Sequence, residues 1–138
     1  MVGKMVWLAA LLLVGCDDKG AGTPAARDTG SACAEPEAIW ENVRDVVLLP
    51  SCGFSSCHGD SAQGGLAIEV DSTADVLVGV MSQQRPDVEL VSAGDPAASY
   101  LVWKIEGHAD IERDAMPPPV GGLCDEHVRL IKAWITEL

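Results

Sequence analysis

The segment "SCGFSSCHGD", from Ser51 to Asp60, places two thiols and an imidazole within ten residues. A covalent haem site uses two cysteines to bind the vinyl groups, and the histidine after the second cysteine binds iron. Here four residues separate Cys52 from Cys57, whereas the common haem pattern has two. The additional residues must loop out of the turn, which the glycine and serines of the gap favour. The segment therefore predicts a haem c site with Cys52 and Cys57 as attachment points and His58 as an iron ligand.

Two other chemistries fit the same residues. A disulfide between Cys52 and Cys57 would form a small structural loop and leave His58 exposed. A zinc-binding knuckle could instead use both thiolates, with His58, His108 or His127 completing the ligand set. Adjacent cysteine and histidine ligands give poor geometry around one zinc ion, and thiols tend to oxidise outside the cytoplasm. The disulfide is thus the stronger of the two alternatives to haem.

A second iron ligand is offered by "DAMPPPVGG", in which Met116 precedes three prolines. A thioether suits haem iron, and a methionine–histidine pair raises the reduction potential. The prolines restrict the backbone and would hold the sulfur in place. The other interpretation is a methionine in an exposed loop. His108, close to Asp110 and Glu112, is either an alternative axial ligand or a solvated histidine, so His58 and Met116 are the predicted pair.

The start of the chain has the pattern of an export signal. Lys4 precedes an apolar run from Val6 to Val14, which is shorter than the roughly 20 residues that a membrane-spanning helix needs. The following "LVGC" resembles the bacterial lipobox, which implies cleavage before Cys16 and lipidation of its thiol. We therefore expect a lipoprotein signal peptide at 1–15, a flexible tether at 16–32 and a folded domain at 33–138. The domain would be anchored by lipid to a membrane of the cell envelope and face the periplasm or the cell exterior.

The chain contains five cysteines. If Cys16 carries lipid, four remain, and two arrangements account for them. Either Cys52 and Cys57 hold haem while Cys33 pairs with Cys124, or all four cysteines form two disulfides. A bridge from Cys33 to Cys124 would join the start of the first helix of the domain to the start of the last.

Apolar periodicity predicts helices in four segments of the domain. They are 35–50, begun by Pro36 and ended by Pro50; 71–82; 94–107, with Asp95 as cap, Pro96 in the first turn and Gly107 after the end; and 124–138. The pieces 64–70 and 88–94 are expected to be extended or loop-like. The fold class is therefore small and all-α, with at most a minor two-stranded ribbon.

Two apolar stripes at opposite ends of the domain each need a partner. Packing one on the other would bury both and cross the first and last helices. The stripes consist of Ile39, Val43 and Val47 in the first helix, and Ile131, Ile135 and Leu138 in the last.

The order of "CHG", "GGL", "GDPAASYLVWKI", "MPPP" and "IKAWI" resembles the small mono-haem cytochrome c-like domains of exported planctomycete and myxobacterial proteins. The resemblance extends from about Ile39 to Leu138. It implies a cytochrome c-like fold with one haem c, attached through Cys52 and Cys57. It also implies His58 as the proximal and Met116 as the distal ligand.

The net charge and the motifs of the chain exclude several classes of function. The net charge of −12 argues against binding to nucleic acid or anionic lipid through charge. We find no Ser/His/Asp order, phosphate loop or paired-carboxylate motif, so an enzyme is not predicted. The expected function is electron transfer to a redox partner protein in the cell envelope, with contact to the membrane only through lipid. The alternative is a haem-free, disulfide-stabilised structural or interaction module of the same fold.

Overall fold

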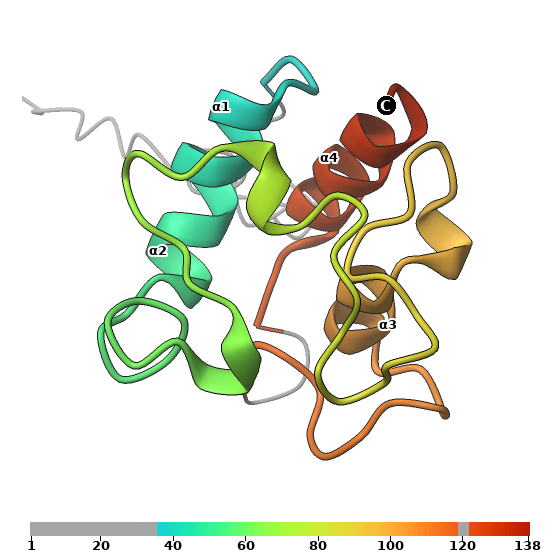
Figure 1. The fold of residues 1–138 in the computed structure, drawn as a ribbon. Helices are drawn as coiled ribbons and strands as arrows, with labels where there is room; N and C mark the ends of the chain where they lie inside the picture. Colours follow the sequence, from blue (N-terminus) through green and yellow to red (C-terminus); the bar gives the residue numbers. More distant parts are fainter. Residues whose placement is uncertain (1–35, 119–121) are drawn as a thin grey trace, which may run out of the picture.

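The computed structural model describes residues 36–118 and 122–138 (Figure 1). The predicted signal peptide and tether, together with Cys16 and Cys33, lie outside the described residues. Helices carry most of the regular structure, as predicted, and within the described ranges none of them is long and apolar enough to cross a membrane. The elements are α1 (Trp40–Asn42), the π-helical η1 (Val43–Leu48), α2 (Leu49–Cys52), the 3₁₀ turns η2 (Gln63–Gly65), η3 (Ala74–Val76) and η4 (Pro96–Ala98), α3 (Tyr100–Glu106) and α4 (Asp125–Thr136).

The first three elements, α1, η1 and α2, form one continuous helical stretch that ends at Cys52. The prediction that this helix begins at Pro36 and ends at Pro50 was wrong at both ends, because it runs from Trp40 to Cys52. Proline lacks an N–H and crowds the preceding turn, and the wider π-helical turn before Pro50 gives the ring room. The stretch closes where the Gly53 N–H donates to the carbonyls of Leu48 and Leu49, at 2.9 and 3.1 Å.

The helix predicted for 71–82 does not form. Only the single turn η3 is helical there, and the chain then extends through the isolated bridges Val78–Val91 and Met81–Glu89. Valines at alternate positions favour extended backbone over helix. Gly79, with φ of 70°, interrupts any continuation of the turn. One bridge is parallel and the other antiparallel, so within the described residues they do not form the two-stranded ribbon that the sequence allowed.

The helix predicted for 94–107 is divided in two. Asp95 accepts a hydrogen bond from the Ala98 N–H at 3.1 Å and caps η4 instead of a long helix. After Ser99 the chain turns into α3, which ends at Gly107 in the left-handed conformation, as the sequence predicted. The break at Ser99 therefore sets the direction in which α3 runs.

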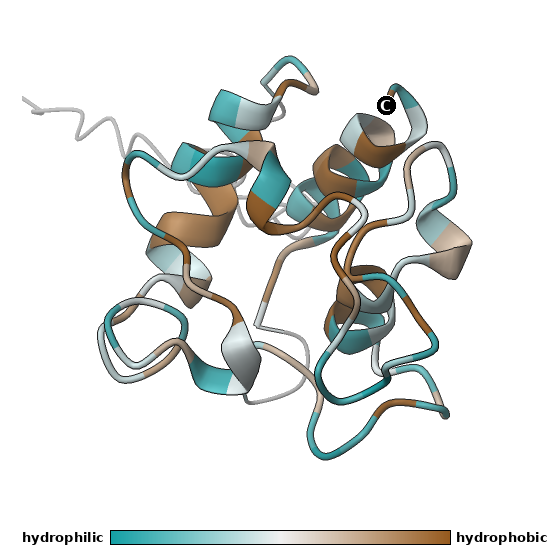
Figure 2. Ribbon diagram, viewed as in Figure 1, coloured by the Kyte–Doolittle hydropathy of each residue, from teal (hydrophilic) through white to brown (hydrophobic). Residues whose placement is uncertain are grey.

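The first and last helical stretches pack on each other. Val43 and Val47 of η1 and Ile131 and Ile135 of α4 are fully buried in one core. The rings of Trp40 and Trp134 meet above them, with centroids 5.4 Å apart. Figure 2 shows hydrophobic residues along these helices and along α3, and the core residues of all three are buried.

The prediction that Ile39 and Leu138 are buried in the two apolar stripes was wrong. Ile39 is 41% exposed and Leu138 is 48% exposed. Each residue lies just beyond a helix end, past the area where the two helices touch.

Candidate functional site

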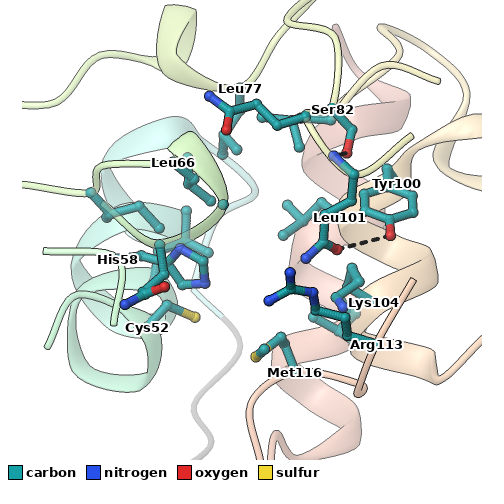
Figure 3. Close-up of a pocket in the computed structure, with 18 residues that line it drawn as sticks. Cys52, His58, Leu66, Leu77, Ser82, Tyr100, Leu101, Lys104, Arg113 and Met116 are labelled. Atoms are coloured by element: carbon teal, nitrogen blue, oxygen red, sulfur yellow. Dashed lines mark hydrogen bonds between the residues drawn. The ribbon is translucent and has the colours of Figure 1, made fainter. Parts of the chain in front are cut away.

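A pocket with a volume of about 480 Å³ separates the α2 side of the molecule from the α3 side (Figure 3). Pockets of roughly 300–1,000 Å³ hold small-molecule ligands and cofactors. Its lining is predominantly apolar, with a few polar groups at one side. The apolar residues are Leu48, Leu66, Ile68, Leu77, Leu90, Leu101 and Ile105.

One wall carries Cys52 and His58, two of the predicted site residues. Cys52 is the last residue of α2, and the chain returns to it at once: the His58 N–H donates to the Cys52 carbonyl at 3.1 Å. On its other side, the His58 carbonyl accepts from the Ile68 N–H at 2.5 Å. Backbone hydrogen bonds on both sides of the residue therefore fix where the imidazole enters the pocket.

The residues between the two cysteines loop away from the pocket. Phe54, Ser55 and Ser56 are exposed, so the two additional residues of the motif are accommodated outside the site. Gly59 closes this loop from beneath, since a Cβ there would lie 2.7 Å from the Gly53 carbonyl oxygen. The glycine after the histidine thus permits close approach of two backbone segments.

The two thiols are in different environments. Both are free, so the Cys52–Cys57 disulfide is not formed in this structure. Cys52 lines the pocket, whereas Cys57 is half-buried beside it, with its Sγ 3.7 Å from the Ser56 Oγ. Burial, and to a smaller extent the neighbouring Cys57, raises the pKa of the Cys52 thiol to about 11.

The remaining described cysteine, Cys124, is disulfide-bonded. Its predicted partner Cys33 lies outside the described residues, so that pairing stays a prediction.

His58 has an unsatisfied ring nitrogen. Its Nδ1 is buried and has no hydrogen-bond partner within the part of the chain that the structure describes. A buried polar atom without a partner is costly and is often explained by a ligand or metal. Within 36–118 and 122–138, no cluster of three or more His, Cys, Asp or Glu side chains could hold a metal ion, which gives the alternative of a zinc knuckle no support.

The opposite wall carries Met116, which α3 holds in place. The Met116 N–H donates to the carbonyl of Lys104 at 2.8 Å. That carbonyl belongs to the last turn of the helix, where no partner within the helix is available. His58 and Met116, the two predicted axial ligands, therefore lie on opposite sides of the same pocket.

The polar side of the pocket was not predicted from the sequence. Tyr100 donates from its hydroxyl to the Gln84 Oε1 at 3.0 Å, and the guanidinium of Arg113 reaches toward the pocket (Figure 3). Arg113 has a φ of 61°, which is unusual for a residue with a side chain. Besides His58, the polar lining consists of Gln63, Ser82, Gln83, Gln84, Tyr100, Lys104 and Arg113. These residues come from four separate segments that share no motif, so no sequence signal could have grouped them.

His108, considered above as an alternative ligand, lies away from the pocket. Its ring is 48% exposed and stacks on Trp103, with centroids 4.8 Å apart. It is thus a surface histidine in this structure. His127 is buried in α4, and it does not line the pocket either.

The fit of these residues to haem rests on donor chemistry. Haem c requires an imidazole, a second iron ligand and two attachment thiols, and the pocket is lined by His58, Met116 and one of the two predicted thiols, Cys52, whereas Cys57 does not line it. Comparison of the chain with protein-family models, curated proteins and solved structures gives no match, so the site is defined by its own geometry.

Proposed function

We propose that this protein is a mono-haem cytochrome c-like electron carrier of the cell envelope. The observation that carries the proposal is that Cys52, His58 and Met116 line one apolar pocket. Haem, when bound, supplies one-electron redox chemistry. The contribution of the protein is to provide ligands from both walls and to exclude water.

Each residue has a distinct role in this proposal. Cys52 and Cys57 would attach the cofactor, and His58 and Met116 would bind its iron. The apolar lining lowers the local dielectric, and the methionine–histidine pair favours the reduced state. Arg113 places positive charge at one side of the pocket, which suits the carboxylates of haem.

The wider setting follows from the sequence. We propose a lipid anchor at Cys16, a cytochrome c-like fold for 33–138 and a redox partner in the envelope. The net charge of −12 favours a partner with a basic docking surface and makes association sensitive to salt.

The test is to express the full chain with its leader in a bacterium that matures c-type cytochromes. We expect a red protein whose haem absorption stays with the polypeptide after acid–acetone extraction. The Cys52→Ala/Cys57→Ala double variant, made in parallel, should lose the haem in the same extraction. A colourless parent protein would contradict the proposal, and it would leave the haem-free structural or interaction module.

A further inference from the structure

One lysine binds the segment that carries Met116 at three points. Lys104 is 8% exposed and lies in α3. Its Nζ donates to the carbonyls of Glu112 and Asp114, at 2.8 and 2.6 Å, and its own carbonyl accepts from the Met116 N–H at 2.8 Å. Both of these Nζ hydrogen bonds go to main-chain carbonyls, while the carboxylates of the same two residues act on the ammonium only through charge.

The neighbouring turn of α3 strengthens the same attachment. The Tyr100 hydroxyl accepts from the Glu112 N–H at 3.0 Å while donating to Gln84. Glu112 is therefore held at its N–H by Tyr100 and at its carbonyl by Lys104. Within the described residues, the side-chain hydrogen bonds to 112–116 come from Lys104 and Tyr100 of α3. Just before this segment, the Arg85 guanidinium donates to the Asp110 carbonyl at 2.7 Å, so α3 is the main but not the sole support of the loop.

We propose that Lys104 is the positioning residue for Met116, with Tyr100 as its auxiliary. Its ammonium fixes the backbone of 112–116 against α3, so that the thioether faces His58 before any cofactor is present. Hydrogen bonds from a charged donor are stronger than neutral ones, which suits this role. The inference rests on the proposed function for its purpose, but the attachment itself can be tested without haem.

The test compares Lys104→Met, which keeps an apolar stem but removes the donors, with Lys104→Arg, which retains donors. Lys132→Met is the matched control, because the Lys132 side chain is 42% exposed, pairs with Glu106 at 2.9 Å and does not contact the segment 112–116. The first readout is amide hydrogen exchange at Met116 in the full chain. We expect Lys104→Met to speed this exchange by about tenfold or more relative to the parent. Lys104→Arg should recover most of the protection, and Lys132→Met should leave it unchanged.

The second readout is the thioether-to-iron absorption at the red edge of the visible spectrum of the haem-loaded protein. We expect Lys104→Met to weaken or lose this band and Lys104→Arg to restore it. If Lys104→Met keeps both the absorption band and the Met116 amide exchange rate of the parent, the inference is overturned. If the parent holds no haem, the proposed function fails, and the exchange data still decide the role of Lys104.

A folding defect in Lys104→Met would show as lost helical circular dichroism. In that case Tyr100→Phe decides, since it removes only the hydroxyl that contacts Glu112. We expect faster exchange at Glu112 and Met116 with the remaining core protected as before. Unchanged exchange at both amides would reject the inference.

Discussion

His58 and Met116 lie on opposite walls of one pocket, although each is held there by a different backbone contact. His58 is fixed by the carbonyl of Cys52, and Met116 by the carbonyl of Lys104. Both carbonyls are at the ends of helices, where they have no partner within the helix. The ends of α2 and α3 thus define the separation between the two proposed ligands.

Met116→Ala should remove the thioether-to-iron absorption and lower the reduction potential, because methionine–histidine ligation raises that potential. Visible spectroscopy and a redox titration of the haem-loaded protein measure both effects. Met81→Ala is the control, since Met81 is 46% exposed and does not line the pocket. An unchanged band in Met116→Ala would show that another group binds iron.

Gly59→Ala should destabilise the loop that presents His58. The new Cβ would approach the Gly53 and Phe54 carbonyl oxygens to 2.7 and 3.0 Å, and these backbone atoms cannot rotate away. Overpacking of this kind costs about 1–3 kcal/mol. Urea unfolding measures the loss, and Ser61→Ala, at an exposed position of the same loop, should change little. Equal stability of the two variants would contradict this account of Gly59.

Ile131→Ala tests the packing of the first and last helices. Ile131 is fully buried in the shared core, so we expect a loss of about 2–5 kcal/mol in the free energy of unfolding. Leu138→Ala, at the exposed end of the same chain segment, should change it by less than about 0.5 kcal/mol. Similar losses in both variants would mean that the two residues are buried to similar extents in solution.

The raised pKa of Cys52 predicts a pH dependence in chain prepared without haem. A Cys57→Ala background removes the smaller cause of the shift and leaves burial, so the rate of alkylation at Cys52 should still be rising above pH 9, because the thiolate is the reactive form. If the rate already levels off near pH 9, the ordinary pKa of a cysteine thiol, the burial of Cys52 is contradicted.

The raised pKa of Cys52 also makes the stability of the folded state depend on pH. The folded state holds the Cys52 proton more tightly than the unfolded state, so its contribution to stability is complete below the ordinary thiol pKa. That contribution is lost as the pH rises through that value toward about 11. Thermal unfolding of the same variant across this range, with Cys52→Ala/Cys57→Ala as the reference, measures the difference.

Local signals in the sequence predicted some elements well. Gly107 ends α3 because a left-handed residue can close a helix, and α4 follows a long stripe of apolar residues. The helix at 71–82 failed because valine-rich periodicity does not distinguish a helix from an extended segment over so few residues. The end at Pro50 failed because the change to a π-helical turn depends on how the whole stretch packs.

Some residues of the candidate site could likewise be predicted from the sequence, and others could not. Cys52, His58 and Met116 could be predicted because each has chemistry that few other residues supply. Lys104 and Tyr100 could not, since a lysine and a tyrosine in an amphipathic helix give no sign of binding a distant backbone. Their role depends on where the segment 112–116 returns to α3, and that return is a property of the tertiary fold.

The hydrogen bond from His58 to Cys52 has a consequence for how such a motif can change over time. It closes the loop at its base, while Phe54, Ser55 and Ser56 at the crown are exposed. Residues can be gained or lost at the crown without moving either end, because loop length costs little free energy. An insertion or deletion at the crown should therefore leave His58 in place, whereas a change that breaks the contact at the base should displace it.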